Sequence, residues 1–439
     1  MQQAFTRYLE KRANLERWPL YAESVDDIET VVVIPCLAER RNLAATLTSL
    51  AECPSARLRH TLILCVVNNR TAEHARAEDI ANNHALLNDL RLLLGGRDSE
   101  LLPHNAVSEL RLAFVDASSS GNELPNKDGV GLARKIGLDW GVHLLAESSA
   151  QVRLLCSLDA DTTIASNYLE AIHEAFTSDD AWAGVVYFEH PLPDDLAQRQ
   201  AIVGYESFLR CHVHGLRLAE SPYAFHTVGS TMVCTPEAYV AVSGMNRRQA
   251  AEDFYFLQQL AKTGGMKLIA TTTVYPSARP SHRVPFGTGR SVRNQMERDN
   301  SVHETYAPET YTVVKQCLAL AARLDTDVDE VLRCAAGYNS ALSEFLRSQN
   351  IASAWPRMRR GSTTCAQRVR QFHTWFDAFR TLKLIHFLRD NGMPNVDVGD
   401  AALTWAQSEG AQANTPEELL MWLRANDRAP ANGPPMGLQ

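Results

Sequence analysis

The sequence predicts an α/β fold in which helices cover both faces of a mostly parallel sheet, followed by a mainly helical C-terminal region. Three observations support this prediction. Apolar runs of strand length alternate with amphipathic helical stretches from residue 30 onward, which is the pattern of repeated βαβ units. The runs are apolar throughout, as expected for strands that are buried on both faces. Beyond residue 301 these runs give way to a Leu- and Ala-rich helical pattern.

Four predicted strands and three predicted helices make up the first part of the α/β region. The strands are short and rich in apolar residues, and they cover residues 30–35, 61–67, 111–116 and 154–158. The helices carry large apolar residues at helical spacing, and they cover residues 39–50, 86–93 and 130–140. Because strands and helices alternate along the chain, we expect these strands to pair in parallel.

The second part of the α/β region continues the alternation. Further helices and strands are predicted over residues 167–176, 182–188, 201–218, 252–262 and 266–274. Thr235-Pro236 is a strong helix start, because threonine caps a helix well and proline suits its first position. A Pro-, Arg- and Gly-rich loop then covers residues 276–290.

The length of 439 residues exceeds what one ordinary core accommodates. We therefore predict a leader over residues 1–29, an α/β domain over 30–300, a helical region over 301–426 and a disordered tail over 427–439. The tail assignment rests on its Pro, Gly and Asn content.

Composition and charge narrow the class of protein. The chain is 45% hydrophobic and 21% charged, and its net charge of −8 argues against a nucleic-acid partner. Nine cysteines are scattered without paired C-x-x-C spacing, which indicates reduced thiols and a cytoplasmic protein. No apolar stretch predicts a signal peptide or a transmembrane helix. A peripheral contact with a membrane and the oligomeric state stay open.

The run Asp159-Ala160-Asp161 is the most informative motif of the chain. Its two carboxylates directly follow the apolar strand over residues 154–158, and ligands of parallel sheets bind beyond the carboxyl ends of the strands. Burying two acidic groups there is costly unless a cation lies beside them. A divalent ion that carries a diphosphate fits this requirement. In isolation, such a run is more often an acidic turn that caps the next helix, and the neighbouring segments shift the balance towards a functional role.

Other polar side chains follow the first three predicted strands. Pro35 and Glu39 follow the first strand, Asn68 ends the second and Asp116 ends the third. Side chains in these places can hold a nucleotide base or ribose at the edge of the sheet. Helix capping and solvated loop residues are the simpler alternatives.

A glycine-bearing turn precedes the helix predicted over residues 130–140. Gly129 and Gly131 permit close backbone approach, and Lys127, Arg134 and Lys135 lie around the helix start. Cations oppose the helix dipole at this end unless an anion is present. The pattern favours a phosphate-binding role over a solvated basic turn, although it matches neither a P-loop nor G-x-G-x-x-G.

Taken together, these segments resemble the family-2 glycosyltransferases of the GT-A fold over about residues 30–295. Each matching motif is short, and their order and spacing carry the resemblance more than any one of them does. The matching elements are Val33-Ile34-Pro35 with Glu39 and Asn42, the segment 127–134, Asp159-Ala160-Asp161, Gly229-Ser230-Thr231-Met232 and Ala251-Glu252-Asp253. The resemblance implies a GT-A-like, Rossmann-type sheet and a metal-dependent, hexosyltransferase-type enzyme. Such an enzyme moves a sugar from a nucleotide-diphospho-sugar donor to an acceptor hydroxyl.

The resemblance also implies roles for individual residues. Asp161 is the expected direct ligand of Mg²⁺ or Mn²⁺, and Asp159 is expected to act through water or the ribose. Asp253 is the expected base that deprotonates the acceptor hydroxyl during inverting transfer, with Glu252 as an acceptor-orienting neighbour. The simpler reading of both acids is dipole complementation at a helix start. The expected donor-binding residues are Pro35, Glu39, Asn68, Asp116, Lys127, Arg134, Asp159 and Arg290.

The loop after the last predicted strand supplies further candidates. His282 is a possible third metal ligand, and Arg279, Arg290 and Arg293 could clamp phosphates. The Q-x-x-R-W signature of the membrane-embedded polymerising members is missing from this region, which disfavours processive synthesis across a membrane.

Three alternatives stay open to different degrees. A retaining GT-A transferase that makes a small glycosylated acid fits if Asp253 is not placed as a base. A catalytically silent nucleotide-sugar-binding interaction module fits if the site binds without turnover. A nucleotidyltransferase is disfavoured because the turn Cys36-Leu37-Ala38-Glu39 lacks glycine. The donor sugar, the nucleotide base and the acceptor are not predicted.

Overall fold

The structure is a computed structural model that describes residues 2–177, 181–281, 287–297, 303–323, 326–362, 364–429 and 437–438. Its contacts divide the chain into two compact units, Met1–Pro191 with Thr227–Arg290, and Leu192–His226 with Ser291–Gln439. This division differs from the predicted ranges in three ways. The leader belongs to the first unit, that unit ends at Arg290 and not at residue 300, and residues 192–226 belong with the C-terminal region.

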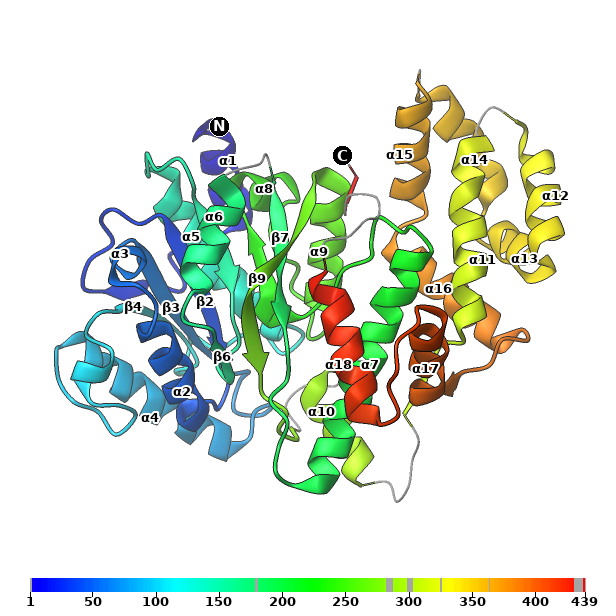
Figure 1. The fold of residues 1–439 in the computed structure, drawn as a ribbon. Helices are drawn as coiled ribbons and strands as arrows, with labels where there is room; N and C mark the ends of the chain where they lie inside the picture. The colour runs from blue at the N-terminus through cyan, green and yellow to red at the C-terminus, as the bar shows by residue number, and fades with distance from the viewer. Residues whose placement is uncertain are drawn as a thin grey trace. The chain divides into compact units, whose positions relative to one another are not determined.

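The first unit is built on a mixed sheet of nine strands within the described residues (Figure 1). The strand order is β1-β4-β3-β2-β5-β8-β7-β9-β6. The bounds are β1 Leu20–Ala22, β2 Thr30–Cys36, β3 Thr61–Asn68, β4 Arg111–Ala117, β5 Leu154–Ser157, β6 Thr162–Ile164, β7 Ala183–Phe188, β8 Met232–Cys234 and β9 Met266–Pro276. The predicted α/β fold is confirmed, including all six predicted strands.

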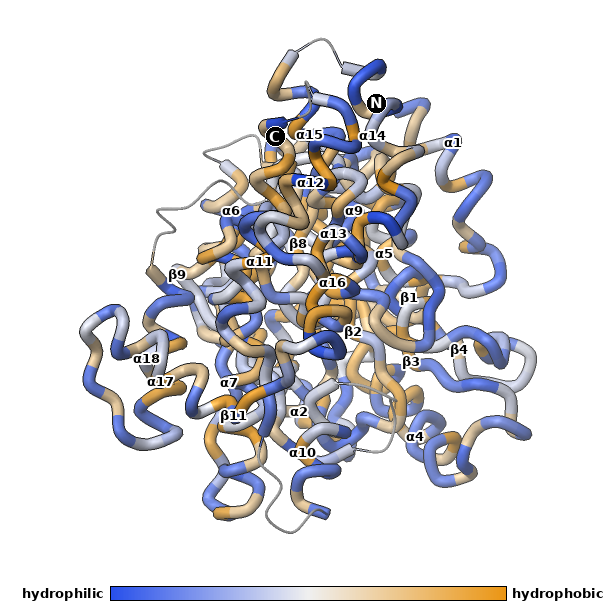
Figure 2. Tube along the Cα trace, turned by 90° about the vertical axis from the view of Figure 1, so that its right-hand side faces the viewer, coloured by the Kyte–Doolittle hydropathy of each residue, from blue (hydrophilic) through white to orange (hydrophobic). Residues whose placement is uncertain are grey.

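The four strands β4-β3-β2-β5 pair in parallel, and their order positions the site. The chain runs outward from β2 to β3 and β4, and then returns to the other side of β2 as β5. The strand order therefore reverses between β2 and β5, which is where open α/β sheets bind ligands. Every residue of β2, β3 and β5 is buried, and hydrophobic stretches mark the trace around β2 and β3 in Figure 2.

Antiparallel strands complete the sheet. β8 lies between β5 and β7, while β1 and β6 form the two edges. Each of these three strands spans only three residues. They were not predicted, because so short a segment shows no periodicity and owes its conformation to its neighbours.

Helices cover both faces of this sheet (Figure 1). They are α1 Gln2–Arg12, α2 Arg40–Ala51, α3 Ser55–Leu58, α4 Ala77–Leu94, α5 Val130–Ala146, α6 Tyr168–Thr177, α8 Pro236–Ala241 and α9 Glu252–Thr263. The predicted start of α8 is confirmed, since the side chain of Thr235 accepts a hydrogen bond from the amide of Ala238. Helix α10, Thr288–Met296, begins inside the region predicted as a loop.

The leader is ordered by a buried polar cluster. Tyr8 of α1 donates a hydrogen bond to Asp139 of α5 over 2.8 Å, and Lys135 donates to both the Tyr8 hydroxyl and the Asp139 carboxylate. The anion that offsets the charge of Lys135 is thus a side chain of the same helix. This pairing explains Lys135 without a bound phosphate.

The second unit is mainly helical, as predicted. It contains α7 Leu196–Leu218, α11 Pro308–Ala319, α12 Val328–Tyr338, α13 Ser340–Ser348, α14 Ile351–Arg360, α15 Cys365–Trp375, α16 Ala378–Asp390, α17 Val398–Ser408 and α18 Pro416–Arg428, with a two-stranded sheet of β10 Glu304–Thr305 and β11 Val396–Asp397. No helix in the described part of either unit is long and apolar enough to span a membrane.

The end of α18 differs from the predicted disordered tail. Asp427 is buried and pairs with Arg210, Arg217 and His226, all from the segment around α7. Leu438 is also buried. Long-range charge pairing fixes the end of α18, and residues 430–436 and 439 of the predicted tail lie outside the described residues.

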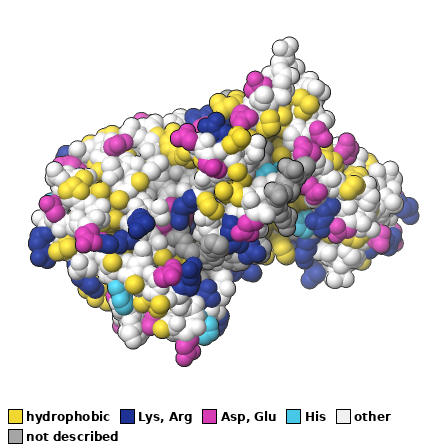
Figure 3. All heavy atoms as spheres, turned by 90° about the horizontal axis from the view of Figure 1, so that it is seen from below, with side chains coloured by type: hydrophobic (Ala, Val, Ile, Leu, Met, Phe, Trp, Pro, Cys, Tyr) yellow, Lys and Arg dark blue, Asp and Glu magenta, His cyan; other side chains and the backbone are white. Residues whose placement is uncertain are grey.

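Basic and acidic side chains are interspersed on the face of the molecule in Figure 3.

Candidate active site

The carboxyl ends of β2 and β5 bring together acidic residues that are far apart in sequence. Glu39 follows β2 at the start of α2, and Asp159 and Asp161 follow β5. The Thr46 hydroxyl of α2 donates to the carbonyl oxygen of Ala160 over 3.0 Å. Helix α2, which follows β2, is therefore tied to the turn after β5 at the point where the strand order reverses.

Arg279 bridges these turns. It lies just after β9, and its guanidinium donates to both carboxylate oxygens of Glu39 at 2.6 and 2.9 Å. The same guanidinium donates twice to Oδ2 of Asp161, at 2.7 and 2.9 Å. Burial and the nearby charge of Asp161 raise the pKa of Glu39 to about 8, although Arg279 and Asn42 oppose the shift. Burial likewise raises the pKa of Asp161, with Arg279 opposing.

A second arginine, Arg134, connects Asp159 to the start of α9. Its guanidinium donates to Asp159 over 2.7 Å, to Glu252 over 3.0 Å and to the hydroxyl of Ser157 over 2.7 Å. Arg134 and Glu252 are each 4% exposed, whereas the Asp159 side chain is 33% exposed. The buried guanidinium of Arg134 thus pairs with an accessible carboxylate, Asp159 in the turn after β5, and with a buried carboxylate, Glu252 in α9.

Asp253 follows Glu252 at the start of α9, and its surroundings change its pKa strongly. Burial, with Glu252 adding to it, raises the pKa of Asp253 to about 7, while Arg134 opposes the shift. Helix α9 starts at Ala251 in the left-handed region, with φ of 58°. Such a conformation is uncommon for alanine and is often found at functional sites. Asp253 is therefore half-buried, positioned by the fold and close to a pKa suited to proton transfer near neutral pH.

The remaining predicted residues of the first unit occupy several environments. Pro35 is buried within β2. Asn68 is buried at the end of β3, and its side-chain oxygen has no hydrogen-bond partner among the described residues. Asp116 accepts hydrogen bonds from Ser118 and Ser119. Burial alone would raise the pKa of Asp116, but the hydrogen bonds from Ser118 and Ser119 outweigh it and lower the pKa. One oxygen of Asp116 thus caps its own loop.

The glycine-bearing turn packs against protein and not around an open cradle. A Cβ at Gly131 would lie 2.6 Å from the carbonyl oxygen of Arg248 and 2.7 Å from that of Asn246. A Cβ at Gly129 would meet the backbone of Gln249 at 2.8 Å. These glycines let the turn approach the loop that leads into α9. The predicted phosphate-binding role of the two glycines is thus replaced by a packing role, while Lys127 is exposed at the turn.

The loop after β9 contributes Arg279, one of the three arginines that were expected to clamp phosphates. Arg290 is exposed in α10 and forms no ion pair within the described residues. His282 lies outside the described residues, so its predicted role as a metal ligand is untested. In the sequence, nothing local distinguishes Arg279 from the other basic residues of its loop.

A divalent ion fits the oxygen donors of this site in part. Among the described residues, no three His, Cys, Asp or Glu side chains lie together as a metal-binding group. Mg²⁺ commonly binds one or two carboxylates and completes its shell with substrate phosphates and water. Asp159 and Asp161 provide two such carboxylates, and Asp161 is held by Arg279. The donor set therefore suits a metal that arrives with a diphosphate.

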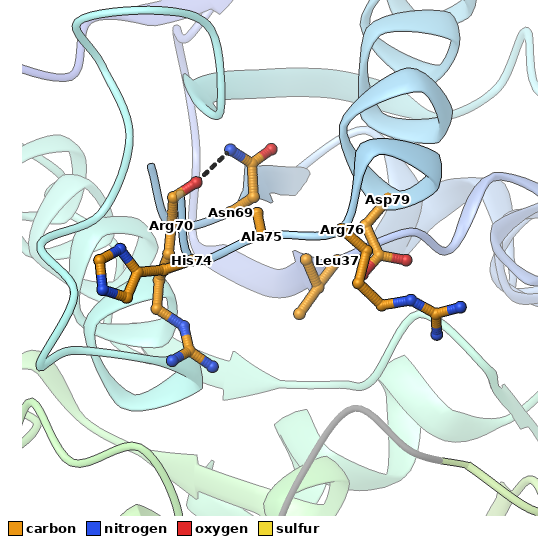
Figure 4. Close-up of a pocket in the computed structure, with 7 residues that line it drawn as sticks. All are labelled: Leu37, Asn69, Arg70, His74, Ala75, Arg76 and Asp79. Carbon is orange, nitrogen blue, oxygen red and sulfur yellow. Dashed lines mark hydrogen bonds between the residues drawn. The ribbon is translucent and has the colours of Figure 1, made fainter. Parts of the chain in front are cut away.

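A pocket of about 180 Å³ lies beside the turn that follows β2. It is lined by Leu37 from that turn and by Asn69, Arg70, His74, Ala75, Arg76 and Asp79 from the segment after β3 and the start of α4 (Figure 4). Asn69 donates to the carbonyl oxygen of Arg70 over 2.9 Å. The pocket thus opens near the carboxyl ends of the two strands where a nucleoside is expected.

Comparison with known proteins gives only structural matches. No family model matches the chain, and neither does any curated protein. A crystal structure of S. aureus TarS 1–349 in complex with UDP-GlcNAc matches with a TM-score of 0.39 and 11% identity, over 88% of this chain and 93% of that one. The same TarS fragment in complex with UDP matches with a TM-score of 0.37 and 10% identity, over 80% of this chain and 91% of that one.

Proposed function

We propose that this protein is a glycosyltransferase that moves a sugar from a nucleotide-diphospho-sugar to an acceptor hydroxyl. The observation that carries the proposal is the Arg134 link between Asp159 and Glu252. It joins the carboxylates at the ligand-binding edge of the sheet to a pair of acids at the start of α9. A donor-binding side and a proton-accepting side are thereby held together by one buried side chain.

In this proposal the donor lies across the carboxyl ends of the parallel strands. The nucleoside occupies the pocket beside Leu37 and Asn69, where polar groups and apolar surface meet. Glu39 and Asp116 lie at the neighbouring strand ends and contribute hydrogen-bond acceptors. The pocket is small, which suits a nucleobase or ribose better than a whole donor.

Asp253 is the proposed base. A carboxylate with a pKa near 7 can remove a proton from a hydroxyl group while the acceptor attacks the sugar. The carboxylate of Glu252 is buried and accepts a hydrogen bond from Arg134, so its proposed role is to keep α9 and its neighbour Asp253 in place. In-line attack by a deprotonated hydroxyl group favours inversion at the anomeric carbon.

Metal dependence forms part of the proposal. Asp161 and Asp159 would hold Mg²⁺ or Mn²⁺ together with the oxygens of the donor diphosphate. A bound divalent ion neutralises the charge that develops on the leaving diphosphate. Removal of divalent ions with EDTA should abolish transfer, and added Mn²⁺ should restore it.

The cysteine environments support a reducing compartment such as the cytoplasm. All nine cysteines are free, and seven of them are buried. Buried free thiols act as small hydrophobic side chains.

The test is donor turnover with a panel of UDP- and GDP-sugars in the presence of Mn²⁺, measured as release of the nucleoside diphosphate. Wild type should release it from one donor class, and Asp253→Asn should reduce sugar transfer by at least about a hundredfold. Asp329→Asn is the matched control, since Asp329 is also the second residue of a helix and is exposed in α12. The proposal fails if no donor is turned over, or if the two variants behave alike.

Two outcomes of that test would favour the alternatives. Binding of a donor without any release would support a nucleotide-sugar-binding interaction module. Retention of the donor anomeric configuration in the product, read by proton NMR, would support a retaining transferase and remove Asp253 as the base.

A further inference from the structure

The guanidinium of Arg279 lies between two acidic turns, in the position that a metal ion would take. Its guanidinium lies within 2.6–2.9 Å of Glu39 and within 2.7–2.9 Å of Asp161. The side chain is 30% exposed, and the carboxylates are less so, at 10% for Glu39 and 25% for Asp161. The arginine therefore reaches inward from the surface to acids that are partly removed from water.

The site carries more acidic than basic side chains. Five acidic side chains, Glu39, Asp159, Asp161, Glu252 and Asp253, share the guanidinium groups of Arg134 and Arg279. Arg134 is fixed in the interior by three hydrogen bonds. Arg279 is the more accessible of the two, and it belongs to a segment without regular secondary structure. Of the two cations, Arg279 is the one that can leave without disturbing the core.

Arg279 and a divalent ion compete for the same oxygen of Asp161, Oδ2. Both nitrogens of Arg279 that reach Asp161 donate to the same oxygen, Oδ2. A divalent ion bonded to the same oxygen would bring a second cation next to the guanidinium. Two like charges at such short range repel strongly.

We infer that Arg279 is the resident cation of Asp161 and competes with a divalent ion for this carboxylate. This inference rests on the proposed function, because it concerns the metal that the proposed donor would bring. In the chain without donor, Arg279 offsets the charge of Asp161, so the metal binds weakly. A diphosphate adds negative charge, which supplies a new partner for Arg279 and frees Asp161 for the ion.

The consequence is that metal binding and donor binding depend on each other. A ligand shifts such an exchange only by its different affinity for the two arrangements. Metal should therefore bind more tightly in the presence of a nucleoside diphosphate than alone, and nucleoside diphosphate should bind more tightly in the presence of metal by the same factor. Arg279 sets the size of this coupling.

The test is titration of the protein with Mn²⁺ in the absence of nucleotide, with free Mn²⁺ measured by electron paramagnetic resonance. Arg279→Met removes the competing cation and should bind Mn²⁺ at least about tenfold more tightly than wild type. In the Arg279→Met, Asp161→Asn double variant this gain should disappear. Arg279→Lys keeps a positive charge without the guanidinium fork, and it should give a smaller gain of the same sign.

Arg57→Met is the matched control. Arg57 also lies between two carboxylates, Glu29 and Glu170, and its side chain is 27% exposed. It belongs to the same unit and forms no contact with Asp161, so its removal should leave Mn²⁺ affinity within about threefold of wild type.

Unchanged or weaker Mn²⁺ binding by both Arg279 variants would overturn the inference. A gain that survives Asp161→Asn, or an equal gain in Arg57→Met, would do the same. Donor turnover separates this inference from the proposed function. If wild type turns over a donor while the Arg279 variants bind Mn²⁺ like wild type, the inference fails and the proposed function stands. If the variants show the gain while no donor is turned over, the proposed function fails and the competition for Asp161 stands.

Discussion

The guanidinium of Arg134 occupies the space that a side chain at residue 229 would fill, and Gly229 keeps this space open. A Cβ added at residue 229 would lie 2.3 Å from Nη2 and 2.9 Å from Cζ of Arg134. The same Nη2 donates to Asp159 over 2.7 Å. Because Arg134 is enclosed in the core, a side chain at residue 229 would displace the guanidinium from its partners. The glycine of the Gly229-Ser230-Thr231-Met232 motif is thus a steric requirement of the Arg134 link.

Gly229→Ala should reduce sugar transfer by about a hundredfold, because displacements of about 1 Å at a reacting site cost this much. Thermal unfolding and circular dichroism should still report a folded protein. Gly337→Ala is the matched control, since a Cβ at Gly337 meets nothing within 4 Å. Equal turnover by the two variants would show that the position of Arg134 does not matter for transfer.

Arg134→Met should destabilise the fold by about 3–5 kcal/mol, because it leaves the buried carboxylate of Glu252 without its cation. Arg57→Met serves as the comparison, since its partly exposed ion pairs should contribute no more than about 1 kcal/mol. Urea denaturation measures both free energies of unfolding. A loss for Arg134→Met no larger than for Arg57→Met would mean that the link contributes little.

The pH dependence of transfer follows from Asp253. Its raised pKa, about 7, means that the carboxyl group is protonated in acid and cannot accept a proton from the acceptor. We expect kcat/KM to rise about tenfold per pH unit below pH 7 and to level off above it. Initial rates from pH 5 to pH 9 measure the profile. A profile that is flat between pH 5 and pH 7 would remove Asp253 as the base.

The raised pKa of Asp253 also predicts that the stability of the fold falls as pH rises, whereas the rate of transfer increases. Above the ordinary pKa of an aspartic acid, the unfolded chain releases the proton of Asp253 while the folded protein keeps it up to about pH 7. Stability contributed by this group therefore falls as pH rises through that range. Asp253→Asn removes the ionisation, and its melting temperature should exceed that of wild type at pH 8 and equal it at pH 4. A variant that melts below wild type at pH 8 would contradict this reading.

The framework of the site was predictable because its signals are local. Uniformly apolar runs predicted β2, β3, β4 and β5, and the alternation with helices predicted their parallel pairing. These two features place the ends of β2 and β5 side by side, so Glu39 and Asp161 could be assigned to one edge of the sheet. The acids of the motifs were found because they follow strands or start helices.

The cations of the site were harder to predict because their partners are distant in sequence. Arg279 and Asp161 are 118 positions apart, as are Arg134 and Glu252. Nothing near Arg279 distinguishes it from the other arginines of its loop. Gly131 was misassigned for the same reason, since the backbone that it approaches, at Arg248, is supplied by a distant loop.

The most direct test of the proposed site is calorimetric titration of the protein with UDP- and GDP-sugars in the presence of Mn²⁺. We expect one donor class to bind at a single site per chain, and the Asp159→Asn, Asp161→Asn double variant to bind it at least about a hundredfold more weakly. Absence of binding by every donor, or equal affinity of wild type and the double variant, would contradict a nucleotide-sugar site at the carboxyl ends of β2 and β5.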